Sequence, residues 1–176
     1  VATLVDQARQ GYFSRFVPIF QDVVRKIAEI GDISLNYRRG WDAERDLLQV
    51  LVSTENQDLK YGTTQAGPHR ADIVVKLEGV PASDVLSRGQ QKMLVSALKL
   101  AQGVIQAENT ERTCIFLVDD LPAELDEGNR KRICCYLQEM HTQVFLTCVD
   151  HSSLRNSLDW STGVTKFHVE HGKIID

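Results

Sequence analysis

The stretch Cys114-Ile-Phe-Leu-Val-Asp-Asp120 decides the fold class of this 176-residue chain. Five consecutive apolar residues are typical of a strand covered on both faces in a parallel sheet, since a half-exposed strand would alternate polar and apolar side chains. Two adjacent acids end the run, and α/β proteins place ligands at the carboxyl ends of parallel strands. The stretch therefore predicts an α/β fold with a site at Asp119 and Asp120.

This acid pair has the chemistry of a magnesium site. Two neighbouring carboxylates repel each other unless a cation lies close to them. We expect Asp119 to hold Mg²⁺, commonly through water, and Asp120 to orient an attacking water or accept its proton. The alternative is a strand that ends in a turn with two solvated acids.

Downstream of the acids, the sequence predicts a crossover unit. A helix is expected from about Glu127 to Met140, with Asp126 as its N-cap. A second apolar strand follows at Gln143 to Val149, and the order strand, helix, strand predicts a parallel pair. Residues 164–176 predict a closing hairpin that turns at His171-Gly172.

Upstream of the acids, Leu86-Ser-Arg-Gly-Gln90 begins a second helix. A helix amino end presents unpaired N–H groups, so Ser87 and Gly89 offer a hydroxyl and an open backbone amide to a phosphate. The alternative is an ordinary Ser N-cap with glycine in the first turn. One apolar face of this helix is expected to be buried, made of Met93, Leu94, Ala97, Leu98, Ala101, Val104 and Ile105.

The first part of the chain predicts helices and two strands. Apolar residues recur at helical spacing from Leu4 to about Ile30, where Pro18 should kink or divide the run. Alternation over Asp32 to Tyr37 predicts a half-buried strand. A helix capped by Asp42 is expected to reach about Thr54. A glycine-rich stretch beginning near residue 61 then leads to a strand at Ile73 to Leu77.

Bulk properties exclude several classes of protein. The formal net charge is −4, so no global positive field holds nucleic acid, and any DNA contact must be local or be made by parts outside this sequence. The four cysteines have no CxxC spacing, which favours a reducing cytoplasm over a zinc site or a disulfide framework. No apolar run is long enough to cross a bilayer. The start at Val1, without an initiator Met, leads us to expect a fragment of a longer protein.

Taken together, the motifs resemble the second half of an ABC-type ATPase head, and within that class the RecF family. The resemblance runs from about Tyr61 to the C-terminus and comprises a signature motif, a Walker B strand and a D-loop. Its carriers are Gly67-Pro-His-Arg70, Leu86-Ser-Arg-Gly-Gln90 running through Ala97 to Gly103, Leu117-Val-Asp-Asp120, Ala123-Glu-Leu-Asp126 and Gln143-Val-Phe145.

The resemblance implies a P-loop NTPase head of the ABC type, with a mostly parallel sheet, flanking helices and a helical arm. Residues 1–60 would form the arm part of lobe II with a short strand. Residues 61–112 would carry the signature segment of lobe II. Residues 113–176 would form the Walker B and D-loop part of lobe I.

It also implies a homodimer that closes head to tail around ATP, with Mg²⁺ as the second cofactor. Asp126 in the D-loop would contact the partner copy. The signature residues that would face the γ-phosphate held by the opposite copy are Ser87, Arg88, Gly89 and Gln90.

RecF-like proteins bind DNA in an ATP-dependent way, at junctions of single and double strands. They act with RecO and RecR to help RecA onto gapped DNA, so the resemblance implies roles in DNA repair, recombination, replication and the SOS response in the cytoplasm. Arg70 would lie near the nucleotide or the dimer interface, or else be a solvated loop charge.

The sequence also departs from the ABC pattern. No GxxxxGK[ST] stretch is present, so we expect the C-terminal part of such a protein, inactive alone as an ATPase. Asp120 stands where most ABC ATPases have Glu, as in RecF-like proteins, which fits slow, switch-like turnover. Cys148 aligns with the usual switch histidine, while His151 comes three residues late.

Two other functions stay open at this stage. A magnesium-dependent nuclease or topoisomerase-type domain would use Asp119, Asp120 and Asp126. A non-catalytic interaction module would use the same segments only as a partner surface. Because the sequence lacks the N-terminal strands of an ABC-type head, we expect sheet edge and core surface that they normally cover to be exposed, which would promote self-association.

Overall fold

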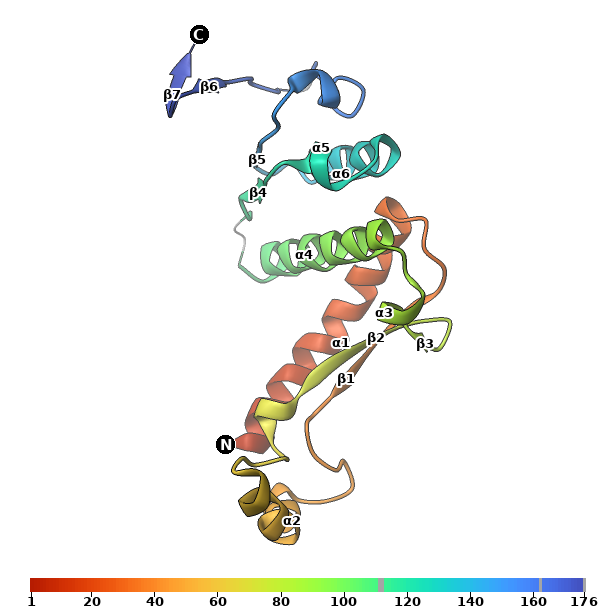
Figure 1. Ribbon diagram of the computed structural model, residues 1–176, viewed down its shortest axis with the longest axis vertical. Coiled ribbons are helices and arrows are strands. Elements are labelled where there is room, and N and C mark those ends of the chain that lie inside the picture. Colours follow the sequence, from red (N-terminus) through yellow and green to blue (C-terminus); the bar gives the residue numbers. More distant parts are fainter. Residues whose placement is uncertain (111–112, 162, 176) are drawn as a thin grey trace. The chain divides into compact units, whose positions relative to one another are not determined.

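The computed structural model describes residues 1–110, 113–161 and 163–175. Its packing divides the chain into two units, Val1–Arg112 and Thr113–Asp176 (Figure 1). The division coincides with the second expected domain boundary. The first expected boundary, near residue 61, lies inside the first unit, because strands on either side of it pair with each other.

The first unit is built on two helices that pack together, α1 (Ala2–Ile27) and α4 (Arg88–Thr110). Pro18 lies inside α1, which continues through it as one helix. Proline removes one helical hydrogen bond, but buried side chains before and after it hold both halves of α1 in the core. The fully buried side chains of these two helices include Phe20, Val23, Ile27, Met93, Ala97, Ala101 and Ile105.

A three-stranded antiparallel sheet completes this core, in the order β1 (Ile33–Arg38), β2 (Asp72–Leu77), β3 (Val80–Pro81). Strand β1 is half-buried, as its alternating pattern predicts. Glu78 and Gly79 both have positive φ and form the two-residue turn between β2 and β3. Such a turn joins only antiparallel strands, so the expected parallel arrangement does not extend to this unit.

Helix α2 (Leu47–Tyr61) begins four residues later than expected. Its N-cap is Asp46, whose carboxylate accepts a hydrogen bond from the Leu48 amide at 3.1 Å. Asp42 was the wrong choice, because its carboxylate accepts from the Glu44 amide in the preceding turn. The helix ends where Gly62 adopts a left-handed conformation. Trp41, Val50 and Ala66 form a small apolar cluster here.

Two short helical segments connect the sheet to its surroundings. The 3-10 helix η1 (Pro68–Arg70) leads into β2, and α3 (Ala82–Val85) lies between β3 and α4. Gly40, the second residue after β1, has a φ of +93° and accepts a hydrogen bond from the Gly67 amide at 3.0 Å. A Cβ at Gly40 would lie 2.3 Å from the Gly67 carbonyl oxygen. Only glycine therefore allows this close backbone contact.

The second unit contains the expected crossover. Strand β4 (Phe116–Val118) pairs in parallel with β5 (Val144–Leu146), and between them lie α5 (Leu121–Glu124) and α6 (Glu127–Glu139). The parallel pair and α6 confirm the crossover prediction, while α5 was not predicted.

The expectation that the first strand is covered on both faces is wrong for the described part of the chain. Leu117 in β4 is 79% exposed, and Phe145, its partner in β5, is 50% exposed. Phe116 and Val118, which flank Leu117 in β4, are half-buried. Burial therefore alternates along β4, as in a sheet with one open face. A run of apolar residues shows that both faces of a strand could be buried, but it does not show that both faces are packed against other elements.

The C-terminal segment forms the hairpin that the sequence predicts. Strand β6 (His168–Glu170) pairs antiparallel with β7 (Lys173–Ile175), and His171 and Gly172 form the turn with positive φ. Asp176, the last residue of that prediction, lies outside the described residues. A 3-10 helix, η2 (His151–Leu154), starts after Asp150, whose carboxylate accepts from the Ser152 amide. Within the described ranges, none of the helices has the length and apolarity of a membrane span.

The Gly40 contact is testable by substitution. We expect Gly40→Ala to lower the free energy of unfolding by about 2 kcal/mol or more, because the new Cβ collides with backbone atoms and the positive φ is strained. Urea unfolding followed by circular dichroism measures the change. Gly11→Ala in α1 is the matched control, since its Cβ would meet nothing within 4 Å. That variant should gain about 0.5–1 kcal/mol, and equal losses in both variants would contradict the assignment.

Candidate functional site

Asp119 and Asp120 lie at the carboxyl end of β4, beside the residue that follows β5. The Thr147 amide donates to the Val118 carbonyl at 3.0 Å and so extends the parallel pairing by one bond. The Thr147 hydroxyl donates to Asp119 Oδ1 at 2.5 Å and accepts from the Asp120 amide at 2.9 Å. One hydroxyl group thus fixes the carboxylate of Asp119 and the backbone of Asp120.

The backbone of Asp120 is left-handed, with a φ of 41° and a ψ of 46°. It forms the N-cap position of α5, and its carbonyl accepts from the Ala123 amide at 3.0 Å. For a residue other than glycine this conformation costs roughly 1 kcal/mol, and aspartate bears it better than most. Such strain is often found at functional sites. The sequence carried no signal for this turn.

The donor set at the acid pair fits an ion shared with a nucleotide. Asp119 is exposed and offers its second carboxylate oxygen, while Asp120 is half-buried beside it. Among the residues that the structure describes, no group of three or more His, Cys, Asp or Glu forms a ready metal cage. Mg²⁺ is usually held by one or two carboxylates together with phosphates and water, so two acids suffice.

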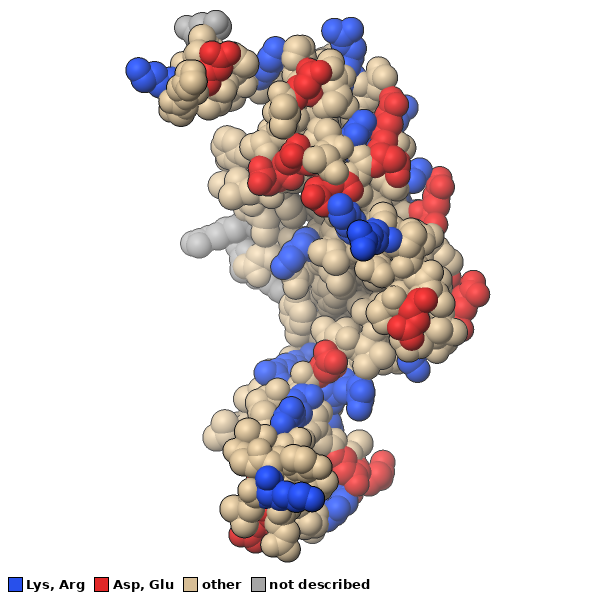
Figure 2. All heavy atoms as spheres, viewed as in Figure 1, with Lys and Arg blue, Asp and Glu red and all other residues tan. Residues whose placement is uncertain are grey.

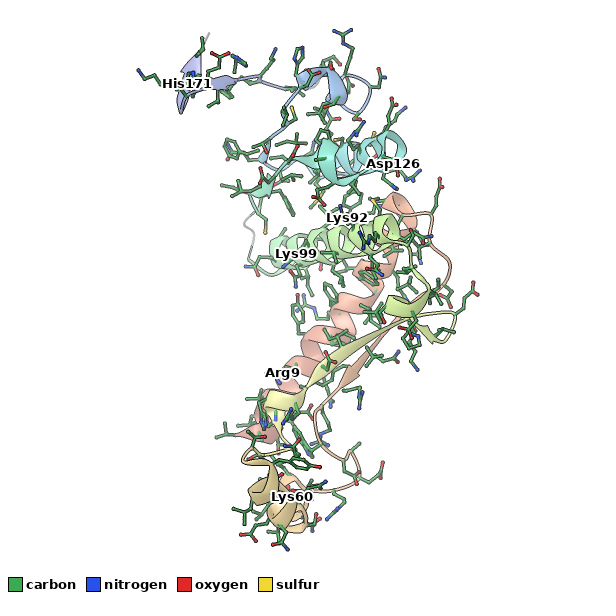
Figure 3. The ribbon with its side chains drawn as sticks, in the orientation of Figure 1. Arg9, Lys60, Lys92, Lys99, Asp126 and His171 are labelled. Atoms are coloured by element: carbon green, nitrogen blue, oxygen red, sulfur yellow. The ribbon has the colours of Figure 1, made fainter. Side chains whose placement is uncertain are left out.

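Asp126 is the N-cap of α6 (Figure 3). Its carboxylate accepts from the Asn129 amide at 2.9 Å and from the Asn129 side-chain nitrogen at 2.6 Å. The backbone bond from Asn129 is the main reason why the pKa of Asp126 lies below its ordinary value. The carboxylate is nevertheless exposed, so capping leaves it accessible to a second molecule.

Arg130 holds the backbone between the acids and α6. Its Nη1 donates to the Pro122 carbonyl at 3.2 Å and to the Leu125 carbonyl at 2.9 Å. From the sequence alone, the basic run 130–132 predicts a solvated helix face, with contact to DNA phosphates as the alternative. For Arg130 the solvated face is wrong, because its guanidinium is turned inward and satisfies these carbonyls. The position of Arg130 in the sequence did not predict these contacts.

The amino end of α4 is closed by a reciprocal pair of hydrogen bonds. Ser87 Oγ accepts from the Gln90 amide at 3.3 Å, and Gln90 Oε1 accepts from the Ser87 amide at 3.0 Å. This is a capping box, which confirms the N-cap interpretation of Ser87. The cap uses the hydroxyl as an acceptor, so its own proton remains available for a phosphate oxygen.

Gly89 has no packing role in the first turn of α4. A Cβ there would meet nothing within 4 Å, and the neighbouring Arg88 is exposed. Glycine in a helix costs roughly 0.5–1 kcal/mol relative to alanine. The structure of this chain alone therefore gives no reason for glycine, whereas a close approach by an anion would.

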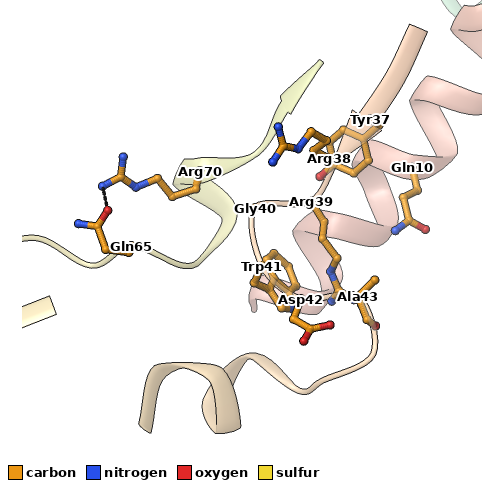
Figure 4. Close-up of a pocket in the computed structure, with 10 residues that line it drawn as sticks. All are labelled: Gln10, Tyr37, Arg38, Arg39, Gly40, Trp41, Asp42, Ala43, Gln65 and Arg70. Atoms are coloured by element: carbon orange, nitrogen blue, oxygen red, sulfur yellow. Dashed lines mark hydrogen bonds between the residues drawn. The ribbon is translucent and has the colours of Figure 1, made fainter. Parts of the chain in front are cut away.

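Arg70 lies in a different part of the first unit, in a cleft of about 640 Å³ at the end of β1 (Figure 4). Its Nε donates to the Thr64 carbonyl at 3.3 Å and its Nη2 to Gln65 Oε1 at 3.2 Å. Arg38 and Arg39 line the same cleft and were missed from the sequence. An Arg-Arg pair at a strand end, followed directly by glycine, was the signal available.

Cys148, aligned with the usual switch histidine, is half-buried after β5. Burial is the main cause that raises the pKa of its thiol, so the side chain stays neutral near pH 7. It therefore supplies no charge of the kind that a protonated histidine would. His151 lies beyond it at the start of η2.

Comparison with known proteins identifies relatives of the whole chain. The family model described as RecF/RecN/SMC N terminal domain matches residues 21–173. The DNA replication and repair protein RecF of Pseudomonas putida strain F1 is 45% identical over 170 residues, which cover 97% of this chain and 46% of that protein. RecF of Azotobacter vinelandii is 47% identical over the same shares. The chain thus spans about half the length of these relatives.

Solved structures share the fold. The recombination mediator protein RecF-ATPrS in the RecFOR pathway has a TM-score of 0.72 at 23% identity, covering 98% of this chain and 46% of that one. A structure concerning ATP-driven dimerization and DNA stimulated activation of SMC ATPases has a TM-score of 0.54 at 14% identity, covering 97% of this chain and 88% of its own. These matches confirm the expected ABC-type head with mixed α/β architecture.

The position of the chain within a longer protein remains a prediction. The matching family model is described as an N terminal domain, whereas the motif order led us to expect the C-terminal part. The resemblance to RecF itself is confirmed by the relatives and by the family model. The chain belongs to the RecF/RecN/SMC family of ATPase head domains.

Proposed function

We propose that this chain is part of an ATP-dependent DNA replication and repair protein of the RecF kind, in which two copies close around ATP. The observation that carries the proposal is the acid pair that Thr147 holds at the end of β4. Two carboxylates lie at the end of a parallel strand, and one of them is in a strained turn. They would form the part of a nucleotide site that holds the metal ion and activates water. The names of the relatives supply the DNA-repair role.

In this proposal the amino end of α4 supplies the other half of the site. The first N–H groups of a helix have no acceptor within it, and the dipole favours an anion there. Gly89 leaves the backbone open, Ser87 keeps a hydroxyl proton, and Arg88 adds an exposed cation. Gln90 holds Ser87 in place through the capping box. These groups would contact the γ-phosphate presented by the partner copy.

The acid pair would act on the nucleotide held beside it. Mg²⁺, when bound, would neutralise charge on the phosphates and orient them. Asp119 would hold that ion, with its carboxylate aligned by Thr147. Asp120 would orient the attacking water or accept its proton. Asp126 would contact the partner copy with the carboxylate face that capping leaves open.

The wider role follows from the relatives and extends beyond this chain. A RecF-like protein would bind DNA at junctions of single and double strands, act with RecO and RecR, and help RecA onto gapped DNA in the cytoplasm. Such a role fits the recombination-mediator description of the solved neighbour. The nuclease alternative would use Asp119, Asp120 and Asp126 without the amino end of α4, and metal-dependent DNA cleavage by the isolated chain would favour it.

The signature is best tested at Gly89. In a full-length protein carrying these residues, Gly89→Asp should weaken ATP-dependent dimerisation about tenfold or more, because a carboxylate would meet the γ-phosphate. Sedimentation velocity with ATP and Mg²⁺ measures the dimer. The added side chain enters open space, so the fold should be unaffected.

Gly11→Asp is the matched control for that experiment, since it places the same charge at another open helical glycine. It should dimerise like the unaltered protein. Dimerisation of Gly89→Asp at the unaltered level would refute the proposed contact, and so would an equal loss in both variants.

The positioning role of Thr147 is testable by an isosteric change. In a full-length protein carrying these residues, Thr147→Val removes both hydrogen bonds of the hydroxyl while keeping the shape of the side chain, so kcat for ATP hydrolysis should fall roughly tenfold or more with little change in KM. Thr147→Ser keeps the hydroxyl and should restore most of the rate. If Val and Ser variants behave alike, or if only KM changes, the hydroxyl does not position the acids.

A further inference from the structure

The cleft at the end of β1 is a basic feature outside the proposed nucleotide site. Three arginines line it, Arg38, Arg39 and Arg70, against a single carboxylate, Asp42. The whole chain has a formal net charge of −4, so this local excess of positive charge runs against its overall balance. Figure 2 shows basic side chains gathered around the part of the first unit that precedes α2.

Arg39 is already used within the protein. Its Nε lies 3.3 Å from Oδ2 of Asp6, a carboxylate only 3% exposed, and its Nη1 donates to the Ala43 carbonyl at 3.3 Å. The guanidinium also covers the ring of Trp41, at 3.8 Å from the ring centroid. Arg39 is thus neutralised by Asp6, and it keeps Trp41 from acting as a stacking surface for a base.

Arg38 and Arg70 keep their binding capacity. In the described part of the chain, Arg38 makes no hydrogen bond or ion pair, and its side chain is exposed. Arg70 uses Nε and one N–H of Nη2 for the loop 64–65, which leaves the remaining N–H groups of its guanidinium. In the view of Figure 4, Arg38 extends toward the side of the cleft where Arg70 lies. The guanidinium of Arg70 is directed away from Arg38, toward Gln65. Arg39 lies over the Trp41 ring.

The backbone holds these two arginines at one end of the β1–β2 ribbon. Arg38 pairs in register with Asp72, two residues after Arg70. The hydrogen bond from Gly67 to Gly40 ties the loop that carries Arg70 to the end of β1. Arg9 adds a further bond, from its Nη1 to the Pro68 carbonyl at 2.6 Å. The backbone that carries both arginines therefore needs little ordering when an anion binds, which favours affinity.

We propose that this cleft binds a phosphate group of a nucleic-acid backbone, with Arg38 and Arg70 as its ligands. Arginine matches phosphate geometry through two parallel N–H bonds. A free nucleotide would bind more tightly if an aromatic ring were available to stack on its base. The Trp41 ring is not available, because the Arg39 guanidinium covers it. Contacts to phosphate alone position a protein on nucleic acid without reading its sequence. The choice of nucleic acid as the ligand rests on the proposed DNA-binding function. The residues that line the cleft all belong to the first unit of one chain, so binding there requires neither ATP nor dimerisation.

The test measures binding of this chain to a fluorescein-labelled duplex of about 20 base pairs, without nucleotide, over ionic strengths of about 50 to 200 mM. Fluorescence anisotropy reports the affinity. Arg38→Ala should weaken binding several-fold and lower the slope of log K against log salt by about 0.9, the value for one lost phosphate contact. Arg38→Ala with Arg70→Lys, which keeps the charge of Arg70 but not its paired donors, should weaken binding further.

Arg25→Ala is the matched control, because it removes the same charge from an exposed ion pair with Asp22. It should leave both affinity and slope close to those of the unaltered chain. Equal effects of Arg38→Ala and Arg25→Ala would overturn the proposal, since bulk charge would then explain binding. So would absence of duplex binding at the lowest salt.

A second readout separates the sources of phosphate. In a Trp160→Phe background, Trp41 is the remaining tryptophan and reports occupancy of the cleft by its emission. Duplex should change that emission, and ATP or inorganic phosphate should do so only at much higher concentration. A response to ATP alone would overturn the nucleic-acid assignment. Because the duplex assay contains no nucleotide, failure of the proposed nucleotide contact would leave it unchanged, so failure of that contact and failure of this cleft are distinguishable.

Discussion

The parallel pairing of β4 with β5 is the constraint on which the chemistry of the second unit depends. The bond from the Thr147 amide to the Val118 carbonyl continues that pairing past the ends of both strands. It brings a hydroxyl from one strand end against two acids from the other. Without this register, Asp119 would lack its aligning partner and Asp120 would lose the bond that steadies its left-handed turn. The crossover helix sets the spacing that makes the pairing parallel.

Backbone contacts play the corresponding part in the first unit. The close approach of Gly40 to Gly67 joins the end of β1 to the loop before β2, and arginines lie at the end of β1 and in η1, just before β2. At α4, the capping box between Ser87 and Gln90 orders the first turn while leaving Gly89 open. At Gly40 the absence of a side chain permits a close backbone approach, and at Gly89 we propose that it leaves room for an anion. Hydrogen bonds then hold the surrounding polar groups in position.

Three features of the structure could not be predicted from local sequence patterns: the N-cap of α2, the contacts of Arg130 and the exposure of Leu117. Asp42 and Asp46 are equally good N-caps by residue type, and the turn at Glu44 decided between them. Arg130 looked like a solvated charge, yet two carbonyls left open by α5 needed a donor. Leu117 belongs to an apolar run but lies on an open face. None of these outcomes is encoded in local periodicity.

By itself, the sequence determined the crossover unit, the amino end of α4, the closing hairpin and the placement of two acids at a strand end. These depend on local patterns: apolar runs, capping residues and turn residues with positive φ. The tertiary structure alone decided that Thr147 meets Asp119 and Asp120, and that Arg38 shares a cleft with Arg70. The reason is physical, because a side chain's hydrogen-bond partner across strands depends on register and on backbone approach, which residue type and spacing do not specify.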